Sequence, residues 1–453
     1  MNAPSRALGR VAICAGLTLP WIGCGTTMLE KGEDQVVVFS WYTGGSDMES
    51  NTEKAFQALV EISQVEFPGV SFVNGSKTYG TAIGDYFSLI GKVFNDHVGV
   101  DALQGQTSWI PYIYEQGWCG PVTDIWEAIR GDEVFGSDMR EMCSLGPIVM
   151  GIPVAMSRDN GFFYSKKVLD SAGVDPASLT TWDAMFAAAE KIKAYQHGNG
   201  FVFMIPDGVS DPDSTDVTVK YSWSLKDTFF DCILPGTIGI EKWSQLTDPR
   251  VATSRMWRED GVRQAFQTFK RYTKLANPDY LTGGDATWMH LILNSAALLH
   301  VGSWAQGMFA RYNSFYGEDY GYIPCPGTST HFVGHFDAFG LAPEPAHPVN
   351  ARRWMQMVGS KIGQDAMNPL LGTISPRKDT SPNAYDGFGQ LLLEDYKNLP
   401  YKMRVESRTN RTFLLDMVVP VGQYDASAGT PADEDQALNF LADLCQRSGI
   451  CSN

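Results

Sequence analysis

Two patterns of apolar and polar residues alternate along the chain, one typical of buried strands and the other of amphipathic helices. Residues 36–39 are four consecutive apolar residues, as expected for a short buried strand. Apolar residues then recur at helical spacing over residues 56–63, and Ser46 with Glu49 forms a capping box ahead of them. We therefore predict a strand that leads into the beginning of a helix.

This alternation continues to the end of the chain. Further strands are predicted at residues 70–73, 101–105, 152–156, 201–205, 296–301, 320–324 and 336–341. Helices are predicted between and after them at residues 83–94, 109–116, 165–172, 182–195, 221–233, 263–276, 286–294, 349–360, 363–370 and 431–445. Alternating strands and helices over 453 residues predict two α/β domains.

The junction after the first strand is a candidate binding site. Trp41 and Tyr42 follow this strand, and Asp47 lies in the first turn of the helix. Ligands of open α/β sheets bind at this carboxyl edge. A carboxylate beside aromatic rings suits a sugar, which has hydroxyls at its rim and C–H groups on its ring face. Alternatively, the two rings are core residues. Gln104 and Gln106, at the end of a later strand, either point into the same crevice or are solvated loop side chains.

The composition limits the partners of the chain. Lys and Arg together number 35 and Asp and Glu 51, which gives a net charge of −16. Such an acidic chain is a poor partner for nucleic acids and for anionic membrane surfaces. With 44% hydrophobic and 19% charged residues, it can fill large cores and is not disordered.

The N-terminus has the features of an export signal. Residues 1–23 contain a weakly basic start and an apolar run at 11–22 that is too short to span a membrane. The Gly-Cys pair that ends at Cys24 resembles a bacterial lipoprotein cleavage site, although Trp21 replaces the usual Leu. We expect Cys24 to carry a lipid and residues 24–34 to form a tether, which would anchor the protein on the periplasmic or extracytoplasmic side. Plain secretion is the alternative.

Of the eight cysteines, Cys14 lies in the signal, and the six that remain beside Cys24 suggest disulfides in an exported chain. Spacing alone allows many pairings, and we predict the economical one, which joins Cys119 with Cys143, Cys232 with Cys325, and Cys445 with Cys451. None of these pairs has CxxC spacing, so the cysteines do not predict a zinc site.

Signatures of catalysis are mostly absent. The chain has no GxSxG, HExxH or GxxxxGK[ST] motif. His331, His335 and Asp337 could share a strand face and hold a metal ion, but two histidines at this spacing are a weak signal. Asp47, Asp159 and Asp337 are candidate carboxylates for a glycoside hydrolase. We predict neither a metal nor a cofactor.

Stretches along the whole chain resemble, in order, the extracellular solute-binding proteins of ABC sugar importers of the glucose-binding type. They include FSWYTGGSD at 39–47, PVAMSRDNGFFYSKKVLDSAGVDP at 153–176, TTWDAMFAAAEKIK at 180–193, SAALLHVGSWAQG at 295–307, HFDAF at 335–339 and GTISPRKD at 372–379. The resemblance implies an α/β, two-lobed periplasmic binding protein fold of type II, each lobe a mainly parallel sheet flanked by helices. The expected lobes are residues 35–151 with 296–345, and 152–295 with 346–453.

The resemblance also implies binding without catalysis. A monomer would hold a mono- or small oligosaccharide between its lobes and deliver it to an ABC permease in the inner membrane. The residues expected to line the sugar site are Trp41, Tyr42, Asp47, Gln104, Gln106, Asn160, Trp223, Trp304 and Asp337. Asp337 could instead pair with Arg158.

Three positions depart from the family pattern and leave the sugar unidentified. Ser303, Gln106 and Leu371 stand where Asp, His and Lys are usual. Each change alters a polar contact to a sugar hydroxyl. A secreted glycoside hydrolase, or a sensor or scaffold lipoprotein that has lost sugar binding, are the alternatives.

Overall fold

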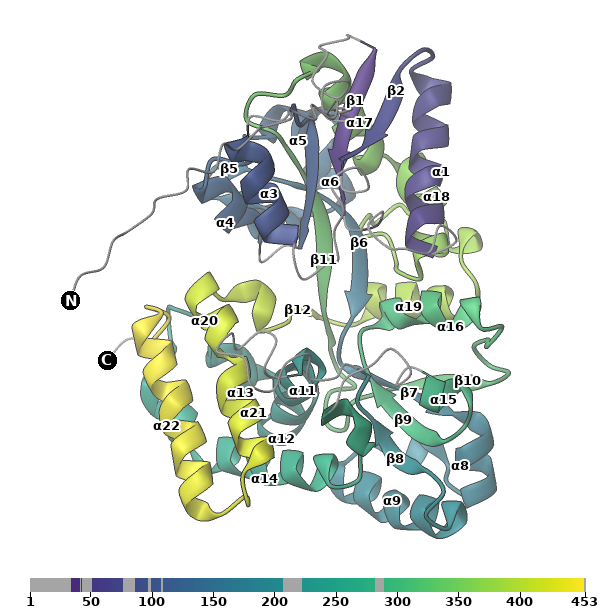
Figure 1. The fold of residues 1–453 in the computed structure, drawn as a ribbon, viewed down its shortest axis with the longest axis vertical. Coiled ribbons are helices and arrows are strands. Elements are labelled where there is room, and N and C mark those ends of the chain that lie inside the picture. Colours follow the sequence, from purple (N-terminus) through teal and green to yellow (C-terminus); the bar gives the residue numbers. More distant parts are fainter. Residues whose placement is uncertain are drawn as a thin grey trace, which may run out of the picture.

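Two lobes make up the described part of the computed structural model, one above the other in Figure 1. The structure describes residues 34–40, 42, 51–75, 86–96, 99–106, 109–206, 222–281 and 289–451. Each lobe contains its own sheet, so the prediction of a two-lobed α/β fold is confirmed. Cys24, Trp41 and Asp47 lie outside the described residues, and what we expect of them stays a prediction.

The first lobe contains a six-stranded sheet with the order β12-β11-β3-β1-β2, in which β6 also pairs with β11. Helices on both faces leave the apolar run of the first strand at most 1% exposed. β1 lies parallel to β2 and β3, whereas β11 lies antiparallel to β3 and β6. The strands are β1 (Gln35–Phe39), β2 (Ser71–Asn74), β3 (Ala102–Gln106), β6 (Ile152–Arg158), β11 (Phe332–Leu341) and β12 (Tyr401–Met403).

The second lobe contains a four-stranded sheet with the order β10-β7-β9-β8. Only the β8–β9 pairing is parallel, so this sheet is mixed and not mainly parallel as we expected. The reason is that β7 runs antiparallel to both of its neighbours, β9 and β10, and an apolar run carries no information about strand direction. The strands are β7 (Gly161–Ser165), β8 (Phe201–Met204), β9 (Ala296–His300) and β10 (Tyr320–Pro324).

Helices cover both sheets, and none in the described residues has the length and apolar character needed to cross a bilayer. With the first sheet lie α1 (Asn51–Glu66), α3 (Tyr86–Asn95), α4 (Ile110–Glu115), α5 (Thr123–Ala128), α6 (Gly131–Val134), α7 (Ser137–Met142), α17 (Pro348–Gly359) and α18 (Lys361–Leu371). With the second lie α8 (Lys166–Ala172), α9 (Trp182–Gln196), α11 (Trp223–Asp227), α12 (Leu234–Ile238), α13 (Ile240–Gln245), α14 (Asp260–Thr273), α15 (Met289–Ile292), α20 (Arg411–Asp416), α21 (Val418–Ala426) and α22 (Pro431–Arg447). Between them lie α16 (Gln306–Arg311) and α19 (Gly387–Asn398).

The strand pairings divide the chain at other points than the sequence-based boundaries. β9 belongs to the second sheet, although residues 296–345 were expected in the first lobe. Conversely, α17 and α18 pack against β1, β11 and α1 of the first lobe, although residues 346–453 were expected in the second. The apolar character of a strand or helix indicates that it is buried, but it does not indicate which of the two sheets it joins.

The cysteines in the described part of the chain form two disulfides. Cys232 bonds with Cys325 and Cys445 with Cys451, at Cα–Cα distances of 5.5 and 5.2 Å. The third expected pairing is wrong, because Cys119 and Cys143 are both free and buried. They pack in different hydrophobic clusters, Cys119 with Val37 and Cys143 with Trp126, where each thiol serves as a small apolar side chain.

Candidate functional site

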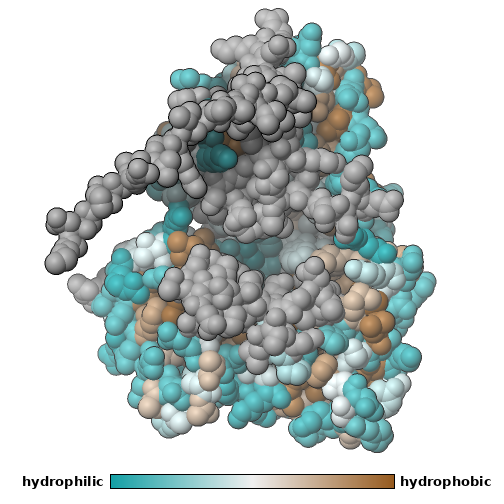
Figure 2. Space-filling model, viewed as in Figure 1, coloured by the Kyte–Doolittle hydropathy of each residue, from teal (hydrophilic) through white to brown (hydrophobic). Residues whose placement is uncertain are grey.

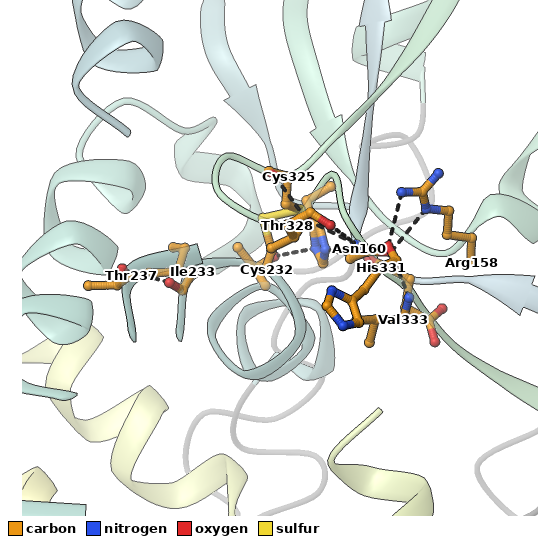
Figure 3. Close-up of a disulfide and its surroundings, with 12 residues drawn as sticks. Arg158, Asn160, Cys232, Ile233, Thr237, Cys325, Thr328, His331 and Val333 are labelled. Carbon is orange, nitrogen blue, oxygen red and sulfur yellow. Dashed lines mark hydrogen bonds between the residues drawn. A yellow bond between two sulfur atoms is a disulfide. The ribbon is translucent and has the colours of Figure 1, made fainter. Parts of the chain in front are cut away.

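Chain segments that pass between the lobes are tied together by the Asn160 side chain (Figure 3). Its amide nitrogen lies 3.0 Å from the Thr328 hydroxyl and 3.0 Å from the His331 carbonyl oxygen. Its oxygen accepts from Arg158 Nε and from the backbone N–H of Val333, both at 3.0 Å. The side chain is fully buried and its donors and acceptor are occupied by the protein. We had expected Asn160 to contact the ligand. In the structure its side chain instead holds together the chain segments that pass between the lobes.

The Cys232–Cys325 disulfide lies beside this crossing (Figure 3). Cys325 donates its backbone N–H to the Asn160 carbonyl at 3.0 Å. His300 lies near both sulfur atoms, close enough for the three groups to hold a metal ion. However, the sulfurs bond to each other, and the ring nitrogens of His300 face Thr228 Oγ1 and the Asp159 carbonyl at 3.1 and 2.9 Å. These groups therefore form a structural cluster.

A second cluster joins the ends of the strands in the first sheet around Asp337. The Tyr42 hydroxyl donates to Asp337 Oδ2 at 2.7 Å, and Gln104 Nε2 donates to the same oxygen at 3.3 Å. Ser40 in turn donates its hydroxyl to Gln104 Oε1. Burial raises the pKa of Asp337, against the effects of His335 and of the Tyr42 hydrogen bond, and it also raises the pKa of Tyr42. Asp337 Oδ1 has no hydrogen-bond partner in the described part of the chain.

A third cluster consists of buried charges that link the first sheet to the second lobe. Arg404 follows β12 and donates to Gln106 Oε1 at 2.9 Å. It also lies 3.2 Å from Glu406, whose other cationic partner is Lys226 at 2.7 Å. Burial opposes ionisation of Glu406, but Arg404 and Lys226 outweigh it and lower the pKa to about 2. Both ions of the Arg404–Glu406 pair are therefore charged.

Asp159 connects this charged cluster to Trp304. The carboxylate of Asp159 lies 2.7 Å from His335 Nδ1 and 3.9 Å from Arg404. A Cβ atom at Gly302 would lie 2.5 Å from the indole Nε1 of Trp304 and 2.7 Å from Asp159 Oδ1. Glycine at this position therefore allows the half-buried indole and the carboxylate to approach the same backbone atom.

The structure brings part of the predicted site together. Tyr42, Gln104, Gln106 and Asp337 meet at neighbouring strands, where Asp337 stands opposite Gln106 in the β3–β11 register. The recess between the lobes is hydrophilic where described residues form its surface (Figure 2). Trp223 begins α11, but its side chain lies outside the description.

Two alternatives for the histidines and acids are wrong. Arg158 pairs with Asp395 and not with Asp337. His331 faces Glu241 at 3.2 Å, while His335 faces Asp159, so these histidines do not converge on a metal site with Asp337.

The buried charges of this region were not predicted from the sequence. Arg404 and Glu406 belong to a segment for which we predicted no site residue, and Lys226 lies three positions after the predicted Trp223. The alternation of charged and apolar residues directly after a strand, Arg404-Val405-Glu406, is the signal that could have revealed them.

A separate groove of about 500 Å³, between α9 and α14, is lined by residues such as Phe186 and Arg271 and includes none of the predicted ligand residues.

Comparisons with known proteins find a matching family, similar chains and similar folds. A family described as bacterial extracellular solute-binding proteins matches residues 85–386. An uncharacterized ABC transporter extracellular-binding protein of Pyrococcus horikoshii is 24% identical over 382 residues, covering 82% of this chain and 78% of that protein. The xylose/arabinose-binding protein of Haloferax volcanii is 23% identical over 393 residues, covering 82% and 76%. A solved chitin oligosaccharide binding protein matches with a TM-score of 0.74 at 14% identity, over 92% of this chain and 100% of that one, which shows the fold alone.

Proposed function

The chain belongs to the family of bacterial extracellular solute-binding proteins, and on this premise we propose that it holds a mono- or small oligosaccharide between its lobes and delivers it to the permease of an ABC importer. The observation that carries the proposal is the meeting of polar groups at one edge of the first sheet, beside the segment that leads to the second lobe. Asp337, Gln104 and Gln106 come from the first sheet, and Arg404 approaches them from the segment that leads to the second lobe. A sugar that touches both sides favours the closed form.

The lining of the site follows from this placement. Trp41, Trp223 and Trp304 would supply ring faces, and Asp47, Gln106 and Asp337 would accept or donate hydrogen bonds to hydroxyls. Tyr42 and Gln104 are buried and would instead hold the carboxylate of Asp337 in place. Asn160 is left out because its hydrogen-bonding groups are already used.

Capture of the sugar would leave it chemically unchanged. Of the carboxylates considered for hydrolysis, Asp159 is engaged by His335, which leaves Asp337 without a placed second carboxylate among the described residues. Incubation with oligosaccharides should therefore produce no new reducing ends. Their appearance would favour a glycoside hydrolase.

The protein would act as a monomer outside the cytoplasmic membrane, anchored through a lipid on Cys24. A Cys24→Ala variant should move from the membrane fraction to the soluble fraction after cell breakage. An unchanged distribution would argue against the lipid.

Binding is tested by titrating intrinsic tryptophan fluorescence with a panel of neutral sugars and by following the melting temperature. A sugar at a hundredfold excess over its Kd should stabilise the protein by about 2.7 kcal/mol. Small-angle scattering should show a more compact form with that sugar. A panel that gives neither stabilisation nor compaction would favour a sensor or scaffold that has lost sugar binding.

A further inference from the structure

The carboxylate of Asp337 has a property that ordinary sugar binding does not require, and we propose that it makes this site prefer amino sugars over their neutral parent sugars. The inference rests on the proposed function, because it specifies the class of sugar that the same site holds. It depends on three observations: an unused carboxylate oxygen, the absence of a cationic partner, and an excess of acidic groups nearby.

One oxygen of Asp337 is fully engaged and the other is not. Tyr42 and Gln104 both donate to Oδ2, at 2.7 and 3.3 Å. Oδ1 is inaccessible to bulk water and has no partner among the residues that the structure describes. A buried acceptor in this condition is costly, so a donor from a ligand would be stabilising.

The neighbouring basic side chains are committed to other acids. His335 pairs with Asp159 at 2.7 Å, and Arg404 lies 3.2 Å from Glu406. Within the described chain Asp337 forms no ion pair of its own. A buried carboxylate without a cation is stabilised more by an ammonium group than by a neutral hydroxyl.

Acidic groups outnumber cationic ones around the crossing. The cations there are Arg158, Lys226, Arg404 and Arg408, and the carboxylates are Asp159, Asp227, Asp337, Asp395 and Glu406. Asp231 is not counted, because burial raises its pKa and favours its neutral form. A ligand with an ammonium group reduces this excess, whereas a ligand carboxylate or phosphate increases the repulsion. We therefore expect uronates to bind more weakly than neutral sugars.

The test is calorimetric titration of the mature chain at pH 7 with two matched series. The first contains D-glucose, D-glucosamine, N-acetyl-D-glucosamine and D-glucuronate, and the second contains D-galactose, D-galactosamine and D-galacturonate. A charge-assisted hydrogen bond in place of a neutral one should make the amino sugar bind roughly tenfold more tightly than its parent. N-acetylation should remove this gain, because the amide carries no charge.

The outcomes separate this inference from the function on which it rests. If neutral parents bind as tightly as amino sugars in both series, the preference is overturned and the sugar-binding function stands. If no sugar of either series binds while another sugar of the neutral panel does, the preference is overturned and the sugar-binding function stands. If no sugar of either series or of the panel binds, both are overturned.

A variant tests whether Asp337 is responsible. Asp337→Asn removes the charge at nearly constant shape and should abolish the preference for the amino sugar, whereas Asp170→Asn, exposed on α8, should retain it. If the Asp337 variant does not fold, the same ratio of dissociation constants is measured on the unaltered chain as the pH is raised past the pKa of the sugar amine. A preference that persists when the amine or Asp337 is uncharged would overturn the assignment.

Discussion

Arg404 donates a hydrogen bond from Nη2 to Oε1 of Gln106 across 2.9 Å, and this bond joins the end of β3 to the residue that follows β12. Gln106 ends β3 of the first sheet. Arg404 continues toward Glu406, which is paired with Lys226 of the second lobe. A ligand that uses Gln106 must therefore compete with Arg404 or bind beside it, which couples occupancy of the site to the contact between the lobes.

Removing the charge of Arg404 should destabilise the protein strongly. Arg404→Met leaves Glu406 with one cation in place of two and leaves Gln106 without its donor. Removal of one member of a buried ion pair costs about 3–5 kcal/mol, which should appear as a lower free energy of unfolding in urea. Arg130→Met is the control, because Arg130 is exposed and pairs with Glu133 at the surface. Equal loss in both variants would remove the special role of Arg404.

The Asn160 side chain should matter more for stability than for sugar affinity. Asn160→Asp keeps the shape but removes the donors to Thr328 and His331, and each buried group left without a partner costs about 1–3 kcal/mol. Urea unfolding and sugar titration are compared with the exposed variant Asn383→Asp. If stability were unchanged and sugar affinity were lost, Asn160 would have to be counted as a ligand-binding residue.

The sequence was informative where burial follows a simple period. The apolar run at residues 36–39, the helix at 182–195 and the final helix at 431–445 all appear with nearly the predicted bounds. Such segments are specified locally, because their apolar faces must be buried wherever the chain places them. Strand direction and lobe membership depend on the path of the chain between distant segments, and the second sheet and β9 differ from the prediction for that reason.

Side-chain roles were less predictable than elements. Asn160 matched the family pattern, but its partners are largely backbone carbonyl and N–H groups of a crossing loop, which leave no residue-type signal. Cys119 and Cys143 are close in sequence but lie in different clusters. The Arg404–Glu406–Lys226 network joins residues about 180 positions apart. A buried charged residue does not follow the periodic spacing of apolar residues, so the sequence pattern does not reveal that it is buried.

The two free cysteines should react with thiol reagents only after unfolding. Burial raises the pKa of Cys119 to about 12 and that of Cys143 still further, so the reactive thiolate is scarce in the folded protein. Iodoacetamide should label neither residue in the native mature protein, and both in urea without reductant. The cysteines of the two disulfides should require reduction first. A peptide that links Cys119 to Cys143 in mass spectrometry would contradict this assignment.

Burial of His300 should make folding weaken between pH 6.5 and pH 4. The ring is buried, and burial lowers its pKa from 6.5 to about 4. The unfolded chain therefore binds this proton more readily than the folded chain. The resulting stability is fully present above pH 6.5 and is lost as the pH falls toward 4, by an amount on the order of 3 kcal/mol.

The measurement is the free energy of unfolding in urea at several pH values across that window. His300→Gln, which cannot titrate, should lose less stability on acidification than the unaltered chain. His197→Gln is the matched control, because His197 is exposed. Glu406 does not obscure the result, since its pKa of about 2 places its own loss of stability below pH 4.5. If the unaltered chain and His300→Gln show the same pH dependence, His300 is not the group responsible.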